Sequence, residues 1–102
     1  MFSVVYISSR DMDEARRIAR ALVEEKLVAC ANFWPMESVF RWEGAVEESG
    51  EVAMICKTRT GLVPEVIKRV KALHSYEVPC ITSWKLGEGS LDYLEWVRQE
   101  TG

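Results

Sequence analysis

The side chains best suited to bind a soft metal ion are three cysteines and one histidine. Cys30, Cys56 and Cys80 are an odd number of thiols with no C-x-x-C pair among them, which excludes a zinc knuckle and a thioredoxin-type redox motif. The odd count also favours free thiols in a reducing compartment over a disulfide framework. His74 is the only histidine, so a mechanism that needs two imidazoles within one chain is excluded. Four methionines complete the set of soft ligands.

Each of these residues also has a purely structural interpretation. His74 falls at the expected end of a helix, where a cation or hydrogen-bond donor complements the exposed carbonyl groups. Cys30 and Cys56 fall in apolar, extended segments, where a free cysteine usually packs as a small core residue. The spacing of these residues alone does not decide between the two interpretations.

The first half of the chain predicts a strand, a helix and a long hairpin. Residues 2–7 are β-branched and aromatic, as in a buried strand. Asp11 and Glu14 form the D-x-x-E start of a capping box, and apolar residues then recur at helical spacing. The chain is expected to be extended over residues 28–42, with an interruption at Pro35, where a bulge or an edge position is expected. Residues 42–46 indicate a tight turn.

The second half predicts a returning strand, a helix, a fourth strand and a closing helix. After a polar stretch over residues 47–51, residues 52–58 have the composition of a strand. Residues 62–73 place apolar side chains on one helical face, with Pro64 tolerated in the first turn. Residues 79–86 are expected to form a strand and residues 90–99 a helix whose inward side chains are Leu91, Leu94 and Val97.

This order of elements, β-α-β-β-α-β with an added helix, predicts an α+β ferredoxin-like split sheet. With right-handed crossovers the strands are ordered 4-1-3-2, with both main helices on one face. A length of 102 residues fits one domain, spanning 1–102. The other face of the sheet has no helical cover and carries apolar runs, and the hairpin offers a free edge, so we expect an oligomer.

Composition excludes several classes of protein. Hydrophobic residues make up 48% and charged residues 28%, as in an ordinary globular domain rather than a disordered chain. Thirteen basic against sixteen acidic residues give a net charge of -3 without a basic stripe, which argues against nucleic acid as a partner. No apolar run is long enough to span a bilayer, and the N-terminus leads into a strand without a basic segment. We therefore expect a cytoplasmic protein with no membrane partner.

Three stretches together resemble the CutA family of divalent-cation tolerance proteins. They are Ala29–Asn32 (ACAN), Ser38–Gly44 (SVFRWEG) and His74–Pro79 (HSYEVP), and both Lys57-Thr58 and Tyr93-Leu94-x-Trp96 fit the same pattern. The resemblance covers essentially the whole chain. It implies a ferredoxin-like subunit that assembles as a homotrimer, similar in architecture to the PII nitrogen-signalling proteins. It also implies association with copper and other divalent metal ions, and no established enzymatic reaction.

Two residues depart from the pattern of that family. Ser75 stands where the family has the first proline of His-Pro-Tyr-x-x-Pro-Glu, and Cys80 stands in place of the glutamate. The loss of the proline releases a backbone restraint after the second helix. The exchange of a carboxylate for a thiol replaces a hard ligand by a soft one, so a metal held at Cys80 is expected to be Cu(I) or zinc rather than a harder ion.

The predicted topology constrains where a metal site can lie. Cys30 and Cys80 fall on opposite edges of the sheet, roughly 14 Å apart at about 4.8 Å per strand, and cannot share a metal within one subunit. In a trimer, the second strand of one chain could approach the fourth strand of the next. The hypothesis is therefore an inter-subunit metal site formed by Cys30 of one chain with His74 and Cys80 of its neighbour.

A second hypothesis is a cleft for a small anionic metabolite, by analogy with PII trimers. Donors would come from Asn32, Arg41, Lys57 and Tyr76, with Trp42 as an apolar wall. Against it, Lys57 and Arg41 could simply pair with glutamates of the hairpin, and no Gly-rich phosphate loop is present. The tryptophans are expected in the core or in a subunit interface. Glu24-Glu25 and Glu47-Glu48 are expected to be solvated, with no role in a site.

An enzyme is the third class. The subunit resembles acylphosphatases in outline, whose catalysis uses an arginine and an asparagine around a phosphate loop after the first strand. The corresponding segment here, Ile7–Asp13, contains Arg10 but also two acids that would repel a phosphate, and it is not Gly-rich. No Ser-His-Asp or Cys-His arrangement is recognisable. We therefore predict that the protein is not an enzyme.

Overall fold

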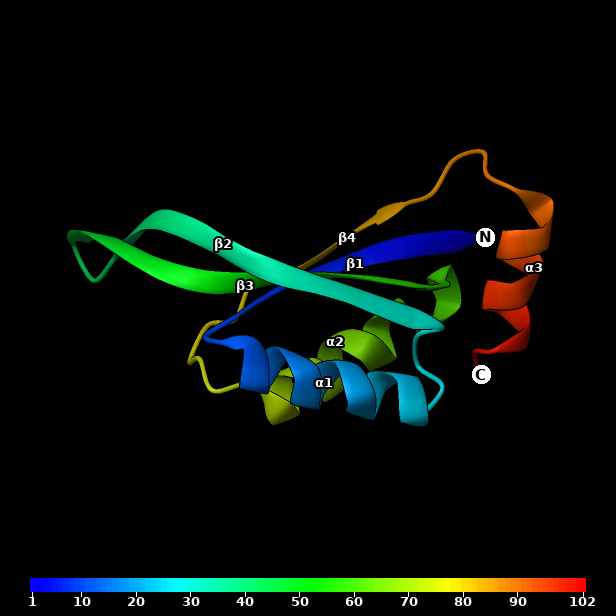
Figure 1. The fold of residues 1–102 in the computed structure, drawn as a ribbon, viewed down its shortest axis with the longest axis horizontal. Helices are drawn as coiled ribbons and strands as arrows, with labels where there is room; N and C mark the ends of the chain where they lie inside the picture. The colour runs from blue at the N-terminus through cyan, green and yellow to red at the C-terminus, as the bar shows by residue number, and fades with distance from the viewer.

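The computed structural model describes all 102 residues and contains one four-stranded sheet with three α-helices (Figure 1). All three strand pairings are antiparallel, and the strand order is β2-β3-β1-β4. This confirms the predicted α+β ferredoxin-like arrangement. The elements are β1 (Phe2–Ser9), α1 (Met12–Glu24), β2 (Cys30–Trp42), β3 (Ala45–Arg59), a short 3-10 turn (Thr60–Leu62), α2 (Val63–Leu73), β4 (Ile81–Lys85) and α3 (Leu91–Gln99).

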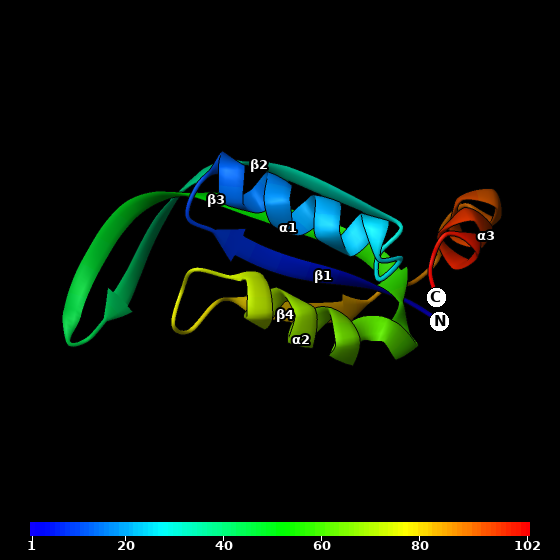
Figure 2. The ribbon, with the colours of Figure 1, turned by 90° about the horizontal axis from the view of Figure 1, so that it is seen from below.

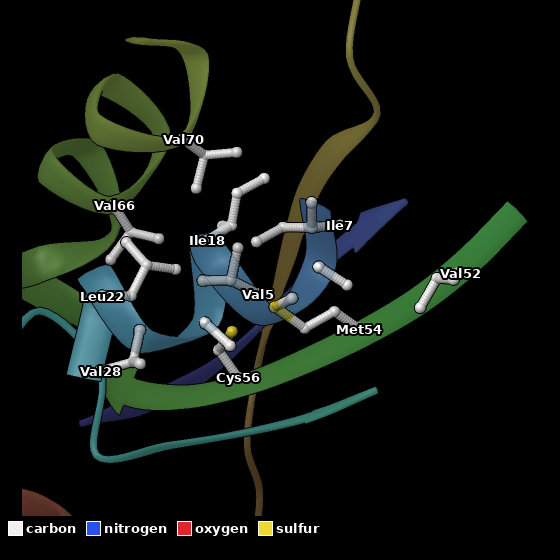
Figure 3. Close-up of a cluster of buried hydrophobic side chains, with 12 residues drawn as sticks. Val5, Ile7, Ile18, Leu22, Val28, Val52, Met54, Cys56, Val66 and Val70 are labelled. Atoms are coloured by element: carbon white, nitrogen blue, oxygen red, sulfur yellow. The ribbon is translucent and has the colours of Figure 1, made fainter. Parts of the chain in front are cut away.

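Helices α1 and α2 lie side by side on one face of the sheet (Figure 2). Their apolar stripes meet alternate residues of β1 and β3, so that Ile18 and Leu22 pack with Val66 and Val70 over Val5 and Met54 (Figure 3). Helix α3 lies at the end of the sheet away from the tip of the β2–β3 hairpin (Figure 1). None of the helices combines the length and the apolar character that a membrane-crossing helix needs.

The start of α1 has the predicted cap. The Asp11 side chain accepts a hydrogen bond from Glu14 N–H at 2.8 Å, which satisfies one of the free donors of the first turn. Pro64 occupies the first turn of α2, as expected, because the missing N–H has no partner there in any helix. The N-terminus of α1, just after β1, is thus fixed by a side-chain hydrogen bond rather than by contacts with the sheet.

The β2–β3 hairpin is longer and more regular than the sequence suggested. Its register runs without a shift from Cys30↔Lys57 to Trp42↔Ala45, so β2 has no bulge at Pro35, whereas the edge position given as the other expectation there is confirmed. Pro35 is tolerated because β2 is an edge strand and does not need a donor on its outer side. The polar stretch over residues 47–51 is also part of β3, where its residues pair with β2 from Phe40↔Glu47 to Met36↔Glu51.

The hairpin turn consists of Glu43 and Gly44, with φ of 49° and 81°. Two positive φ values match the right-handed twist of the flanking strands, as in the preferred two-residue hairpin turns. From residue 36 to residue 51 the two strands pair only with each other and extend beyond the body of the molecule (Figures 1 and 2). We call residues 36–51 the arm.

The range of β4 and the orientation of one side chain in α3 also differ from the prediction. Strand β4 covers only Ile81–Lys85, since Pro79 cannot donate to the ladder. In α3, Val97 is buried but Leu91 is 81% exposed, so the prediction that Leu91 faces inward is wrong. Helix α3 contacts the end of the sheet instead of lying across it, and its first turn consequently has no apolar surface to cover.

The sheet face opposite α1 and α2 has no helical cover and is called the open face. Alternation along the strands places Val4, Tyr6, Trp34, Ile55 and Trp84 on it. Trp34 is 43% and Trp84 51% exposed, which is unusual for residues with so much apolar surface. The uncovered face predicted from the topology is therefore present, with exposed aromatic side chains.

Candidate functional site

A groove of about 870 Å³ lies between the arm and the loop that connects α2 to β4. We call it the arm groove. Its floor is the end of the open face, at Tyr6, Ser8 and Cys80. Its walls come from the arm and the loop, and comprise Met36, Glu37, Ser38, Val39, Phe40, Trp42, Glu47, Glu51, Ser75, Tyr76, Glu77 and Val78.

Strand alternation accounts for part of the arm's contribution to the arm groove, although Glu37 and Val39, which alternate to the other side, also line it. Met36 and Phe40 stand opposite Glu51 and Glu47 in the register and point to the same side as the open face. Glu48, opposite Val39, points to the other side and does not line the groove. Adjacent glutamates of β3 are therefore in different environments, although both are exposed to solvent.

The arm groove is acidic. Glutamates 37, 47, 51 and 77 line it, and no lysine, arginine or histidine does. The Tyr76 hydroxyl donates a hydrogen bond to Glu51 Oε2 at 2.7 Å and so links the loop to the arm. Burial and the negative charge of Glu51 raise the pKa of Tyr76 above its ordinary value, which keeps the phenol protonated and able to donate. Tyr6 donates to Met36 Sδ at 3.5 Å on the groove floor.

The loop after α2 is held in place by Glu14. This side chain is fully buried and accepts hydrogen bonds from Arg10 N–H at 2.9 Å and from Ser75 N–H at 2.8 Å. Burial alone would raise the pKa of Glu14, but the hydrogen bonds from Ser75 and Arg10 outweigh burial and lower it. One charged carboxylate thus joins the start of α1 to the loop that borders the arm groove.

His74 is engaged by backbone groups on both sides of its ring. Tyr76 N–H donates to Nδ1 at 3.0 Å, so Nδ1 carries a lone pair and the proton of the neutral ring is on Nε2. Nε2–H then donates to Ser8 O at 2.7 Å. The ring caps the end of β1 rather than the carbonyl groups of α2, although His74 is the C-terminal cap residue of that helix.

The three thiols are in three different environments. Cys30 lies on edge strand β2, where its Sγ is 3.3 Å from Tyr93 Oη of α3. Cys56 is fully buried in the core, and burial raises the pKa of its thiol to about 12. Cys80 is exposed on the groove floor, beside edge strand β4. No three side chains among His, Cys, Asp and Glu converge closely enough in one chain to hold a metal ion together.

The residues predicted for an anion cleft are not all brought together. Trp42 and Tyr76 line the arm groove, whereas Asn32, Arg41 and Lys57 do not. Asn32 and Lys57 are diagonal neighbours on the open face, and Arg41 points to the other side of the arm. Neither Lys57 nor Arg41 forms one of the side-chain ion pairs of the chain. Lys57 and Arg41 therefore do not form the ion pairs with hairpin glutamates that were considered as the alternative to a role in an anion cleft.

Sequence reasoning missed most of the groove lining, in particular Tyr6, Ser8, Met36 and Glu51. It also assigned Glu47 to a solvated surface with no site role. Extending the period-two alternation of the hairpin into residues 45–51 would have placed Glu47 and Glu51 on the same side as Phe40 and Met36. The contribution of the loop at residues 75–80 carries no comparable local signal.

Comparison with known proteins gives a consistent family relationship. Residues 3–100 match the family model described as CutA1 divalent ion tolerance protein. The chain is 46% identical to the divalent-cation tolerance protein CutA of Thermus thermophilus over the full length of both. It is 44% identical to the protein of that name from Archaeoglobus fulgidus, over 95% of each chain. It is also 39% identical to human protein CutA, over 97% of this chain and 56% of the human one.

Solved structures agree with the sequence matches. The CutA1 structure from T. thermophilus superimposes with a TM-score of 0.96 at 46% identity, and each chain is covered completely. The structure described as the periplasmic divalent cation tolerance protein CutA from A. fulgidus superimposes with a TM-score of 0.96 at 43% identity, over 98% of each chain.

Proposed function

The chain belongs to the CutA1 divalent ion tolerance family, and from this premise we propose that it acts in the response to metal ions as a homotrimer that binds copper or another divalent or soft metal ion. The proposal includes a single functional domain over residues 1–102, no catalysed reaction and no nucleic-acid or membrane partner. The observation that carries the metal part is the exposed thiol of Cys80, beside the sheet edge opposite to that of Cys30.

The open face supports the homotrimer. Trp34 and Trp84 expose large aromatic surfaces on it, and monomeric proteins seldom leave such patches in water. Both edge strands, β2 and β4, also have free backbone donors and acceptors. A closed ring of three subunits would bury the aromatic surface and pair the edge of one chain with that of the next.

In the proposed metal site, the thiols of Cys30 from one subunit and Cys80 from its neighbour are the soft ligands. His74 of the same subunit as Cys80 is the third ligand, through Nδ1. Coordination by Nδ1 requires the Tyr76 N–H to turn away, since that group now occupies the lone pair. Ser75, in the position of a family proline, has no ring to restrain the backbone there, so the hydrogen bond from its N–H to Glu14 is the restraint that this change must keep or break. Two thiolates favour Cu(I) or zinc over harder cations.

The second candidate is a PII-like trimer that binds a small anionic metabolite between subunits. Asn32 and Lys57, which are close together on the open face, favour it. The arm groove does not suit an anion, because its four glutamates would repel one. An anion site would therefore lie at the subunit boundary beside Lys57, with Trp42, Tyr76 and Arg41 outside it.

Native mass spectrometry of the untagged protein, with Cu(I) titration under reducing conditions, tests the metal proposal. We expect a trimer that takes up three Cu(I), with uptake lost in Cys80→Ser and in Cys30→Ser but retained in the control Cys56→Ala. A monomer at micromolar concentration contradicts the trimer. Unchanged uptake by Cys80→Ser contradicts the site. Three anions per trimer with no tight metal would instead favour the second candidate.

A cytoplasmic location is proposed from the free thiols, which suit a reducing compartment. The A. fulgidus relative is described as periplasmic, so the compartment is best measured directly. Cell fractionation followed by immunodetection should place the protein with cytoplasmic markers, and recovery in a periplasmic extract would contradict this part of the proposal.

A further inference from the structure

Helix α3 places a polar group directly on the Cys30 thiol. The Tyr93 hydroxyl lies 3.3 Å from Cys30 Sγ, and either atom can be the donor of this hydrogen bond. The two residues are 63 positions apart in one chain and meet where α3 lies beside the start of β2 (Figure 1). The contact therefore forms within each subunit, whatever covers the sheet from outside.

Tyr93 belongs to a helix whose C-terminal end is fixed to the body of the molecule. Val97 is fully buried, and Thr101 Oγ1 donates a hydrogen bond to Val97 O at 2.8 Å. Arg59, at the end of β3, donates to Thr101 O at 2.9 Å. The Tyr93 ring also packs against the ring of Trp96, with the two centroids 5.6 Å apart. The Tyr93 hydroxyl is thus held at Cys30 by a fixed element, as a supporting group for a metal ligand needs to be.

Metal binding would fix the direction of this hydrogen bond. Cys30 coordinates as a thiolate, so its S–H bond breaks, a sulfur–metal bond forms and the proton leaves to solvent. The bound sulfur can then only accept, whereas a phenol keeps its proton near neutral pH. Tyr93 Oη–H becomes the donor to a charged acceptor, and such a hydrogen bond is stronger than one between neutral groups. The contact consequently stabilises the metal-bound state more than the free state.

We propose that Tyr93 is a positioning residue for the Cys30 ligand, whose hydroxyl orients the sulfur and stabilises the metal-bound thiolate. This inference rests on the proposed function, because it assigns a partner to one ligand of that metal site. Tyr93 is not itself a ligand, since Cu(I) and zinc prefer a thiolate to a neutral phenol oxygen. Cover by the neighbouring subunit strengthens the hydrogen bond, because a water-poor boundary has a lower dielectric constant.

Competition for Cu(I) between the untagged full chain and a chromophoric chelator, under reducing conditions, measures the effect on affinity. Tyr93→Phe removes only the hydroxyl, and Trp96→Phe is a matched control on the same helix. We expect about tenfold weaker Cu(I) binding for Tyr93→Phe and a change within about twofold for Trp96→Phe, since partners of metal ligands typically contribute tenfold or more. In a Cys30→Ser background, Tyr93→Phe should make no further difference.

The spectrum of bound Co(II), a stand-in for zinc, separates a hydrogen bond to sulfur from a general effect on the helix. Such a bond lowers the energy of the sulfur lone pairs. The thiolate-to-Co(II) charge-transfer band should therefore move to longer wavelength in Tyr93→Phe and stay in place in Trp96→Phe.

The outcomes distinguish this inference from the metal site on which it rests. Unchanged Cu(I) affinity in Tyr93→Phe, or weaker binding without the shift of the band, overturns the positioning role and leaves the metal site standing. Complete loss of uptake in Tyr93→Phe would make Tyr93 a ligand and also overturn it. Full uptake by Cys30→Ser overturns the metal site and this inference together.

Discussion

Replacement of Glu14 by glutamine tests whether one buried carboxylate holds the loop beside the arm groove. Glu14 is fully buried, and its two oxygens accept separate backbone N–H groups, from Arg10 at 2.9 Å and from Ser75 at 2.8 Å. Glutamine has the same shape but only one acceptor oxygen. Its amide nitrogen would face one of the two N–H groups, donor against donor.

The size of the effect follows from these two hydrogen bonds. A hydrogen bond to a charged acceptor contributes about 1.5–3 kcal/mol net, and a buried N–H without an acceptor costs about 1–3 kcal/mol. Glu14→Gln should therefore lower the free energy of unfolding by about 2–3 kcal/mol near neutral pH. Arg17, which is 3.9 Å from Glu14 Oε2 and half exposed, adds little because solvent screens it.

The effect should also depend on pH. The hydrogen bonds from Ser75 and Arg10 outweigh burial and lower the pKa of Glu14 in the folded protein, so its carboxylate stabilises the fold above the pKa of the unfolded chain. That stability is lost as the pH falls through the lowered folded pKa. Protonated Glu14 resembles glutamine, so the difference between the two proteins should shrink in acid.

Guanidinium unfolding at one fixed protein concentration, from pH 7 down to pH 3, measures both effects. The matched control is Glu24→Gln on the same helix, where an exposed pair with Arg20 is lost and a change of less than about 0.5 kcal/mol is expected. Equal unfolding midpoints for Glu14→Gln and the unmodified protein at pH 7 would refute the reasoning. A difference that grows in acid would refute the assigned direction of the pKa.

Three further predictions concern the turn, the thiols and the open face. Gly44→Ala should lower the free energy of unfolding by about 1 kcal/mol, because φ is 81° at Gly44. The control Gly61→Ala, at an equally uncrowded site without a positive φ, should have a smaller effect. Thermal unfolding of the two variants compares these effects. Iodoacetamide at pH 8 should alkylate Cys80 first and Cys56 only on unfolding, because burial raises the pKa of Cys56 to about 12; reaction of native Cys56 as fast as Cys80, by mass spectrometry, would contradict this. Trp84→Ser on the open face should dissociate the proposed trimer at micromolar concentration in sedimentation experiments, whereas Trp96→Ser on α3 should not.

The fold was predictable because local patterns and the global arrangement agree. Asp11 and Glu14 correctly predicted the start of α1. For this order of strands and helices, right-handed crossovers predict the strand order that the sheet has. The errors arose where tertiary context overrides a local signal. Pro35 does not interrupt β2; of the two alternatives predicted there, the edge position is confirmed and the bulge is not formed, because an edge strand tolerates a missing donor. Leu91 follows the helical period but lies beyond the surface that α3 covers.

The candidate site was less predictable, because it is assembled from segments far apart in the chain. The D-x-x-E pattern predicted that Glu14 caps its own helix, but nothing local indicates its second bond to Ser75, 61 residues later. Likewise, His74 is recognisable as a potential ligand, whereas the pairing of its ring with Ser8 O and Tyr76 N–H depends on how α2 meets β1. Cys30 and Cys80 could be assigned to opposite edges because strand order alone determines that separation.

The composition of the arm explains why an acidic groove can exist beside an exposed hairpin. Residues 36–51 carry five glutamates and one arginine, so the arm is more negative than the whole chain, whose net charge is -3. A long hairpin that pairs only with itself presents edges on which other chains could add strands. Like charges along these edges oppose such pairing. The same strand alternation directs Glu47 and Glu51 toward the groove and Glu48 away from it. The charge that opposes non-specific association therefore lies on both sides of the arm, and replacing Glu48 should weaken this protection without changing the side that Glu47 and Glu51 share.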